Sequence, residues 1–284
     1  MSGDTSGTAL VLGGGGPVGG AWLTGVLAGL TDAGVDLGRA DVIIGTSAGA
    51  VFGSRLACGQ PPRELYERQL SGADRIELRV TAAQTLRFLW AALGSRDPER
   101  SVRRLGRAAL SAARTAPAAE LHDAVRELLR GATDWPARTL RIAAVDAVSG
   151  EVAAFDADSK TDLVDAVAAS CAVPLLWPPV ELDGRRFIDG GSRATANLQL
   201  AAGHRRVLAV VPIPDAVGPH PSARQQATDL TARGTTVTLL CPDHTARRAM
   251  GRNMTTTTRM PAAARAGHAQ GTALANTVPE TWHT

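Results

Sequence analysis

The sequence Gly45-Thr46-Ser47-Ala48-Gly49 places a serine at the centre of a G-x-S-x-G pattern. The pattern follows an apolar run and precedes a helical one, which is the setting of a nucleophile elbow. A sharp turn between strand and helix leaves no room for large neighbours, and Gly45 and Gly49 meet that requirement. We therefore predict that Ser47 attacks a carbonyl carbon. The alternative is a serine that only caps a helix after a glycine turn.

A carboxylate that could serve Ser47 occurs much later, in Phe187-Ile188-Asp189-Gly190-Gly191. Asp189 ends a short apolar run, and Gly190 and Gly191 turn the chain. A carboxylate at the same sheet edge as Ser47 could take the serine proton directly and pass it to the leaving group. Alone, this motif would indicate a turn aspartate that bonds its own backbone. Together with the serine motif it favours a Ser–Asp dyad.

Residues 13–20 (GGGGPVGG) end the first apolar run and open a helical pattern. Successive glycines let backbone N–H groups converge on one point, where an anion can bind. If the first two strands are adjacent, this loop lies beside Ser47. It could then hold the negative oxygen of a tetrahedral intermediate.

Two other interpretations of the glycine loop stay open. The spacing Gly14-x-Gly16-x-x-Gly19 fits a dinucleotide-binding fingerprint. That fingerprint needs an acidic residue at the end of the second strand, where this chain has Gly45-Thr46-Ser47 instead, and Asp36 and Asp41 precede the strand. A purely structural loop is the third interpretation.

Histidine does not offer an obvious base. The order Ser, Asp, His of the α/β-hydrolases is available with His204 or His244, but no histidine stands at a strand end among turn residues. No histidine pair has the spacing of a metal site, and the three cysteines form no CxxC pair. We therefore expect no metal and no organic cofactor. The six histidines are His122, His204, His220, His244, His268 and His283.

The elements that must position these residues alternate between strand and helix. We expect buried strands at 8–12, 41–44, 140–145, 151–155, 207–211 and 237–240 and a hairpin at 180–188, with helices from 19 and at 47–57 and 162–170. Such alternation predicts an α/β fold with a mostly parallel sheet and helices on its faces. A helical, Ala-rich C-terminal extension is expected at about 242–275.

The middle of the chain, about 62–135, contains no convincing strand and predicts a helical insertion, with helices at 63–70, 82–93, 99–113 and 119–130. An apolar stretch, Leu86-Arg87-Phe88-Leu89-Trp90, precedes an arginine-rich one at 100–107. The simpler interpretation is a solvated cover for the sheet. The alternative is a lid or a lipid-facing helix that makes transient contact with a membrane surface.

Composition excludes several classes of protein. The 284 residues include 44% hydrophobic and 20% charged residues, too apolar for a disordered chain. No collagen repeat or sustained heptad occurs. A formal net charge of +3 without a basic, aromatic stripe argues against a nucleic-acid partner. The N-terminus lacks a secretion signal and the three cysteines suggest no disulfide framework, so we expect a cytoplasmic protein. Because no internal repeat or long linker occurs, we expect a single domain over residues 1–284.

Taken together and in this order, the motifs resemble those of the patatin-like phospholipases, or patatin-like lipid acyl hydrolases. The resemblance covers about residues 8–212 and includes three further stretches: Ala169-Ser170-Cys171-Ala172-Val173-Pro174, Trp177-Pro178-Pro179 and Gly184-Arg185-Arg186. It implies a three-layer α/β/α sandwich. It also implies a dyad without histidine, in which Ser47 is the nucleophile and Asp189 the base. The implied oxyanion hole consists of backbone N–H groups of Gly14, Gly15, Gly16 and Ala48.

The expected activity is hydrolysis of a carboxylic ester of a lipid through an acyl-enzyme, with a lipid or another hydrophobic ester as substrate. An acyltransferase that uses the same acyl-enzyme and a catalytically silent lipid-binding protein are the alternatives. The glycine loop departs from the family in one respect: Val18 stands where phospholipid-preferring members often have a basic residue. Because valine cannot bind phosphate, a neutral ester becomes as plausible a substrate as a phospholipid. Arg193 could supply a charge instead.

Overall fold

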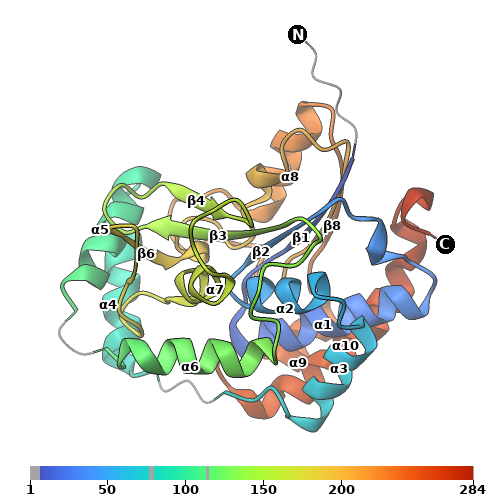
Figure 1. Cartoon of the computed structure of the whole chain (residues 1–284), viewed down its shortest axis with the longest axis horizontal. Coiled ribbons are helices and arrows are strands. Elements are labelled where there is room, and N and C mark those ends of the chain that lie inside the picture. The colour runs from blue at the N-terminus through green and yellow to red at the C-terminus, as the bar shows by residue number, and fades with distance from the viewer. Residues whose placement is uncertain (1–6, 77–79, 113–114, 284) are drawn as a thin grey trace.

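The computed structural model describes residues 7–76, 80–112 and 115–283. A central sheet is covered by helices on both faces (Figure 1). The strands run in the order β5-β6-β3-β2-β1-β7-β8, and β4 pairs with β3. Their bounds are β1 (Thr8–Leu12), β2 (Val42–Thr46), β3 (Leu140–Asp146), β4 (Val152–Phe155), β5 (Val180–Leu182), β6 (Arg185–Asp189), β7 (Arg206–Val210) and β8 (Thr236–Leu240).

The helices that surround this sheet come from all parts of the chain. They are α1 (Gly16–Asp32), α2 (Ala48–Ala57), α3 (Pro62–Ser71), α4 (Ala82–Leu93), α5 (Pro98–Leu110), α6 (Ala118–Leu129), α7 (Leu163–Cys171), α8 (Ala223–Ala232), α9 (His244–Met250) and α10 (Met260–Leu274). None of the described helices combines the length and the apolar character that crossing a bilayer requires.

The sheet is parallel in its interior and antiparallel at one side. Strands β3, β2, β1, β7 and β8 pair in parallel, whereas β4, β5 and β6 join through antiparallel pairs. Strand β1 lies in the middle and is buried from Ala9 to Leu12, as an apolar strand covered on both faces must be. The predicted α/β class with a mostly parallel sheet is confirmed.

Alternate side chains of the strands enter two different cores. Leu10 and Leu12 of β1 pack in a core with α1, α2, α6, α7 and α10, whereas Ala9 and Val11 pack against α8 on the opposite face. Helix α5 also covers this second face, through Val102 packed against Val145. Helix, sheet and helix thus form three layers.

Most of the predicted elements occur within two or three residues of their expected bounds. Helix α1 begins at Gly16 rather than at 19, because Pro17 needs no N–H partner in a first helical turn. Helix α8 was not predicted, since only Ala223, Gln226 and Leu230 of its ten residues are buried and its apolar periodicity is weak. The insertion at 62–135 holds α3 to α6 and no strand among its described residues, as predicted. The single-domain organisation stays a prediction.

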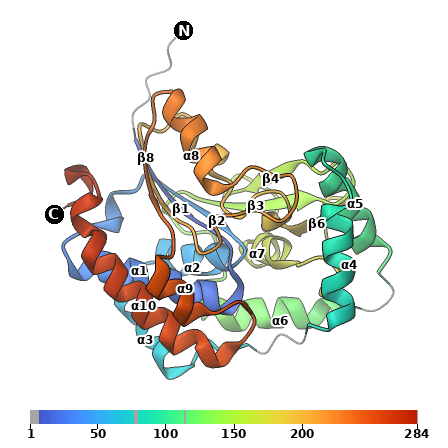
Figure 2. The same ribbon diagram turned by 180° about the vertical axis from the view of Figure 1, so that it is seen from behind.

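The C-terminal extension packs closely against α1 through its helix α10. Figure 2 shows α10 lying along α1. A Cβ at Gly267 would collide with the backbone carbonyl of Trp22, and one at Gly271 would lie 2.5 Å from that of Val26. Trp22 Nε1 also donates to Gln270 Oε1 at 3.1 Å. Glycine at these positions therefore sets how near α10 approaches the helix that follows the glycine loop.

We expect Gly267→Leu to lower the free energy of unfolding by about 3 kcal/mol, because the side chain would push two helix backbones apart. Urea denaturation measures the change. Ala269→Leu, on the exposed side of the same helix, is the matched control and should change stability little. Equal effects of the two substitutions would contradict the close-packing argument.

Candidate active site

The sheet register brings Ser47 and Asp189 together. Thr46 of β2 pairs with Ala143 of β3, and Asp189 of β6 pairs with the next residue, Ala144. Strand β4 pairs with residues 142–145 of β3, so β2 and β6 must share the opposite edge. Because β2 is parallel and β6 antiparallel to β3, their carboxyl ends meet head to head. Ser47, directly after Thr46, therefore lies beside Asp189.

Ser47 occupies a strained turn between β2 and α2. Its φ of 53° and ψ of −119° are unusual for a residue with a side chain. A Cβ at Gly45 would lie 2.6 Å from the Cα of Ala50, and one at Gly49 would overlap the carbonyl of Leu12. The two glycines are thus required by close backbone contacts, which is the geometry expected of a nucleophile elbow.

The two side chains form a direct hydrogen bond. Ser47 Oγ donates to Asp189 Oδ2 at 2.7 Å, and the Gly191 N–H donates to Oδ1 at 2.7 Å. Asp189 is only 6% exposed. Burial raises the pKa of its carboxyl from 3.8 to about 6, although the hydrogen bonds from Ser47 and Gly191 oppose that shift. A carboxylate with this pKa accepts a proton more readily than an exposed aspartate and is still ionised at neutral pH.

A second serine supports the turn from below. Ser170, which is fully buried, accepts a hydrogen bond from the Ser47 N–H at 2.8 Å and donates to the Ala143 carbonyl at 2.6 Å. It therefore ties the Ser47 backbone to β3 at the residue that pairs with Thr46. In the sequence, Ser170 stands out only as part of a family stretch, because its hydrogen bonds depend on tertiary packing.

The glycine loop lies beside Ser47, but one of the four N–H groups expected in the oxyanion hole already has a partner. A Cβ at Gly14 would be 3.1 Å from Ser47 Cβ, so the loop and the elbow are in contact. The Gly14 N–H donates to the Thr195 carbonyl at 2.7 Å. The Gly14 N–H thus already has a partner within the fold, and its contribution to an oxyanion hole stays a prediction.

The three other N–H groups remain candidates. Within the described chain, those of Gly15, Gly16 and Ala48 have no hydrogen-bond partner. All three stand at the N-termini of α1 and α2, where the helix dipole favours negative charge. At position 190, next to Asp189, the fold requires glycine for packing, because a Cβ there would collide with the Ala143 carbonyl.

Neither histidine nor cysteine competes with this pair. All six histidines lie in the described part of the chain, and none lines the cavity that holds Ser47. Cys171 does line it, but burial and the nearby Asp189 charge raise the pKa of its thiol far above the usual range. Cys171 is therefore a neutral thiol. No group of three His, Cys, Asp or Glu residues among those described is arranged to hold a metal ion.

Ser47 opens into an apolar cavity of about 110 Å³. Side chains from α2, α6 and the segment after α7 form most of its wall, with Met260 from the C-terminal extension. The apolar lining residues are Val51, Phe52, Ile76, Leu121, Ala124, Val125, Leu128, Val173, Trp177 and Met260. A cavity of this composition suits a hydrocarbon group.

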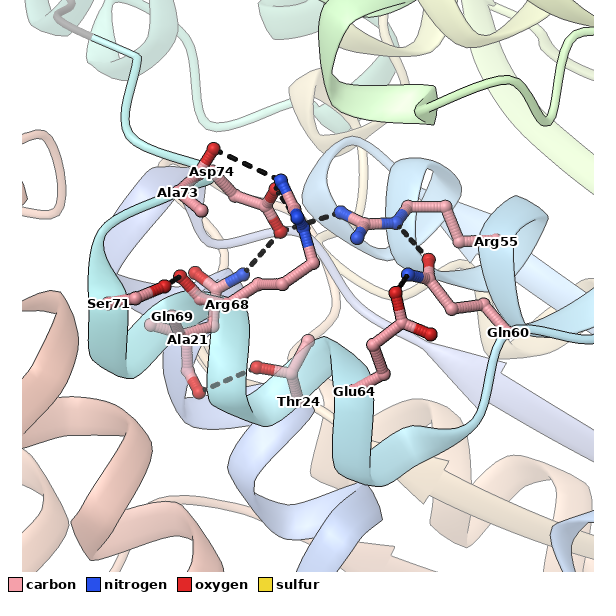
Figure 3. Close-up of polar contacts among 10 residues, drawn as sticks. All are labelled: Ala21, Thr24, Arg55, Gln60, Glu64, Arg68, Gln69, Ser71, Ala73 and Asp74. Carbon is pink, nitrogen blue, oxygen red and sulfur yellow. Dashed lines mark hydrogen bonds and ion pairs between the residues drawn. The ribbon is translucent and has the colours of Figure 1, made fainter.

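Part of the cavity wall is a buried polar cluster, shown in Figure 3. Arg55 Nη1 binds Asp74 Oδ2 at 2.6 Å, and both side chains are inaccessible to solvent. Asp74 also accepts hydrogen bonds from Arg68 and from Gln69. Asp74 and Gln69 both line the cavity. Two arginines thus bind the one carboxylate that this cluster contributes to the cavity lining, so the negative charge of Asp74 is compensated there.

Neither position considered for phosphate recognition provides a charge in this cavity. Val18 is completely buried. Arg193 donates to the Gly150 carbonyl at 2.8 Å and lines a different pocket, with Glu151 and His220. The suggestion that Arg193 supplies a charge to the site is therefore wrong, because the turn after Asp189 directs it to the other side of the sheet.

Comparison with known proteins identifies the family. The family model of the patatin-like phospholipases matches residues 10–202. The chain belongs to the patatin-like phospholipase family. This confirms the resemblance predicted from the motifs, and the family is one of lipid acyl hydrolases. No curated protein sequence matches the chain.

VipD and ExoU are among the solved structures that resemble the chain. VipD from Legionella pneumophila has a TM-score of 0.47 and 14% identity, and the similarity covers 96% of this chain and 67% of VipD. The type III effector protein ExoU has a TM-score of 0.38 and 14% identity, with 96% of this chain and 54% of ExoU covered. The chain thus spans about half to two thirds of these larger proteins.

The dinucleotide interpretation has no support in this arrangement. Asp41 lies at the opposite end of β2 from the glycine loop, where its carboxylate accepts a hydrogen bond from the Thr8 N–H at 2.6 Å. Asp36 accepts a hydrogen bond from the Gly38 N–H at 2.8 Å, before the same strand. Neither carboxylate stands where a ribose would need it.

We expect Ser170→Ala to destabilise the protein by about 1–3 kcal/mol, because the Ser47 N–H and the Ala143 carbonyl would lose their shared partner. We also expect slower reaction of Ser47, since its turn is no longer tied to β3. Urea denaturation and the rate of labelling by a fluorophosphonate measure the two effects. Ser101→Ala, which removes another buried serine hydroxyl that donates to a backbone carbonyl, that of Ala92 at 2.6 Å, is the control for labelling. Unchanged labelling of Ser170→Ala would rule out a positioning role.

Proposed function

We propose that this member of the family is a serine acyl hydrolase that cleaves carboxylic esters of lipids through a Ser47–Asp189 dyad. The observation that carries the proposal is the 2.7 Å hydrogen bond from Ser47 Oγ to Asp189 Oδ2, with Ser47 itself lining an apolar cavity. A nucleophile, a base and space for a hydrocarbon group thus occur together.

The first half of the proposed reaction forms an acyl-enzyme. Asp189 takes the proton of Ser47 as the serine oxygen attacks the ester carbonyl. The N–H groups of Gly15, Gly16 and Ala48 stabilise the oxyanion that develops. When the tetrahedral intermediate collapses, Asp189 returns the proton to the departing alcohol.

The second half releases the acid. Asp189 removes a proton from water, which attacks the acyl-enzyme, and the proton then returns to Ser47. The net reaction consumes one ester and one water and yields one acid and one alcohol. An alcohol in place of water would make the same protein an acyltransferase.

The cavity favours a neutral hydrophobic ester. Among the described residues that line it, Asp74 is the sole charged side chain, and it is paired with arginine. No cation is available there to bind a phosphate, which would need charge-assisted hydrogen bonds. Acylglycerols and simple fatty esters are therefore the substrates to compare first with phospholipids.

We expect a fluorophosphonate probe to label the wild-type protein and not Ser47→Ala, because the probe reacts with an activated serine. Asp189→Asn should lower turnover of a p-nitrophenyl ester by roughly 10³-fold or more. Asp183→Asn, an exposed carboxyl in the β5–β6 turn where φ is 49°, is the control and should remain active. Equal labelling of Ser47→Ala would refute the assignment. Lipid binding without any ester hydrolysis would indicate the silent alternative.

We expect kcat/KM for a soluble ester to rise with pH about a midpoint near 6. Burial raises the pKa of Asp189 to about 6, and the base must be ionised to act, so activity falls as pH drops below that value. A profile from about pH 4.5 to about pH 8 measures the midpoint. A midpoint near 4 would contradict a buried base. Loss of activity at every pH when a single histidine is replaced would indicate a catalytic triad with histidine instead of the dyad.

A further inference from the structure

Helix α4 presents an apolar face that nothing in the described chain covers. Leu86, Leu89, Trp90 and Leu93 follow the i, i+3, i+4, i+7 spacing of one helical face, and their exposed fractions are 67%, 37%, 71% and 60%. Of the twelve residues of α4, only Ala91 and Ala92 are buried. Scattered exposed apolar residues are ordinary, but a continuous face of this kind marks an interaction surface.

Arginines of α5 border this face. Arg100, Arg103 and Arg107 are exposed, and the guanidinium of Arg104 lies 4.6 Å from the ring centre of Trp90. The four arginines line one shallow hollow with Leu110 and Val148. Figures 1 and 2 show α4 and α5 side by side at the edge of the molecule away from α8.

The charge of the α4–α5 pair is strongly positive. Residues 82–110 contain six arginines and two acidic residues, Asp97 and Glu99. Asp97 accepts a hydrogen bond from the Arg100 N–H at the start of α5, and Glu99 lies 3.5 Å from Arg103. Most of the arginine charge is therefore free to meet an external anion.

We propose that the α4–α5 surface docks the protein on an anionic lipid bilayer. The α4–α5 surface is the apolar face of α4 together with Arg100, Arg103, Arg104 and Arg107. Leucine and tryptophan side chains enter the boundary between headgroups and acyl chains, while the arginines bind lipid phosphates and anionic headgroups. Both kinds of contact are needed, because either one alone gives only weak membrane binding.

The α4–α5 surface is connected to the candidate active site. Gln84 of α4 donates from Nε2 to the Leu175 carbonyl at 2.9 Å. Trp177, two residues further on, lines the cavity that holds Ser47. Docking through α4 would thus hold the wall of the cavity close to the bilayer. The use of that position for catalysis rests on the proposed hydrolase function, but the binding itself does not.

Vesicle binding tests the proposal. Full-length Ser47→Ala protein, which cannot consume the lipid, is sedimented with vesicles of phosphatidylcholine alone or mixed with phosphatidylglycerol. We expect binding to the anionic vesicles that weakens as salt is added, because the arginine contribution is screened. The triple variant R100Q/R103Q/R107Q should bind about a hundredfold more weakly. The affinity of the double variant L86S/W90S for the vesicles should fall about tenfold or more at any salt concentration.

Matched control variants test whether binding depends on this surface or only on the total charge and exposed apolar area of the protein. R205Q/R224Q/R233Q removes three exposed arginines on and near α8, and Val217→Ser removes an exposed apolar residue elsewhere. Both should bind vesicles like the parent. Equal binding by the surface variants and the controls would overturn the proposal. So would an absence of binding to anionic vesicles at low salt, or a concentration-dependent dimer that L86S/W90S abolishes.

The activity arm distinguishes this proposal from the proposed function. In the protein with Ser47 intact, L86S/W90S should hydrolyse a soluble p-nitrophenyl ester at the wild-type rate and an ester held in anionic vesicles at least tenfold more slowly. Vesicle binding without hydrolysis of any ester would refute the hydrolase and leave the docking surface intact. Equal hydrolysis of the vesicle ester by variant and wild type would refute docking as the route to substrate.

Discussion

The shared edge of β3 is the constraint on which the candidate site depends. Strand β2 arrives along that edge in parallel and β6 in antiparallel orientation, so the two carboxyl ends meet at Ala143 and Ala144. Ser170 then binds both Ser47 and β3, which holds the turn at a fixed height above the sheet. Residues separated by more than a hundred positions in sequence are positioned by backbone pairing rather than by flexible side chains. The geometry is therefore preorganised.

Burial determines the chemistry of the pair. The same burial raises the pKa of Asp189 and keeps the Cys171 thiol neutral. The N-termini of α1 and α2 lie next to Ser47, and the partial positive charge of a helix N-terminus favours an anion without a formal charge. A neutral cavity with oriented dipoles suits an uncharged ester that becomes an oxyanion only during reaction.

The exposed arginines of α5 and the candidate active site lie on different parts of the molecule. The arginines within reach of the cavity neutralise Asp74, whereas those of α5 stay free at the surface beside the apolar face of α4. Recognition of an anionic surface and recognition of the ester can therefore be separate events. The C-terminal extension contributes to both the fold and the site: Met254 accepts a hydrogen bond from the Val18 N–H at the start of α1, and Met260 lines the cavity.

The sequence by itself determined the α/β class, the elbow around Ser47 and the family, because strand periodicity and glycine spacing are local properties. It also placed the helical insertion correctly, although it missed α8, whose few buried residues give little pattern. The tertiary structure decided what local patterns cannot specify. In the folded chain the Gly14 N–H donates to the Thr195 carbonyl, Arg193 binds the Gly150 carbonyl away from the cavity, and Ser170 accepts a hydrogen bond from the Ser47 N–H. Each of these outcomes depends on which distant backbone group a residue meets, and that is fixed only when the sheet assembles.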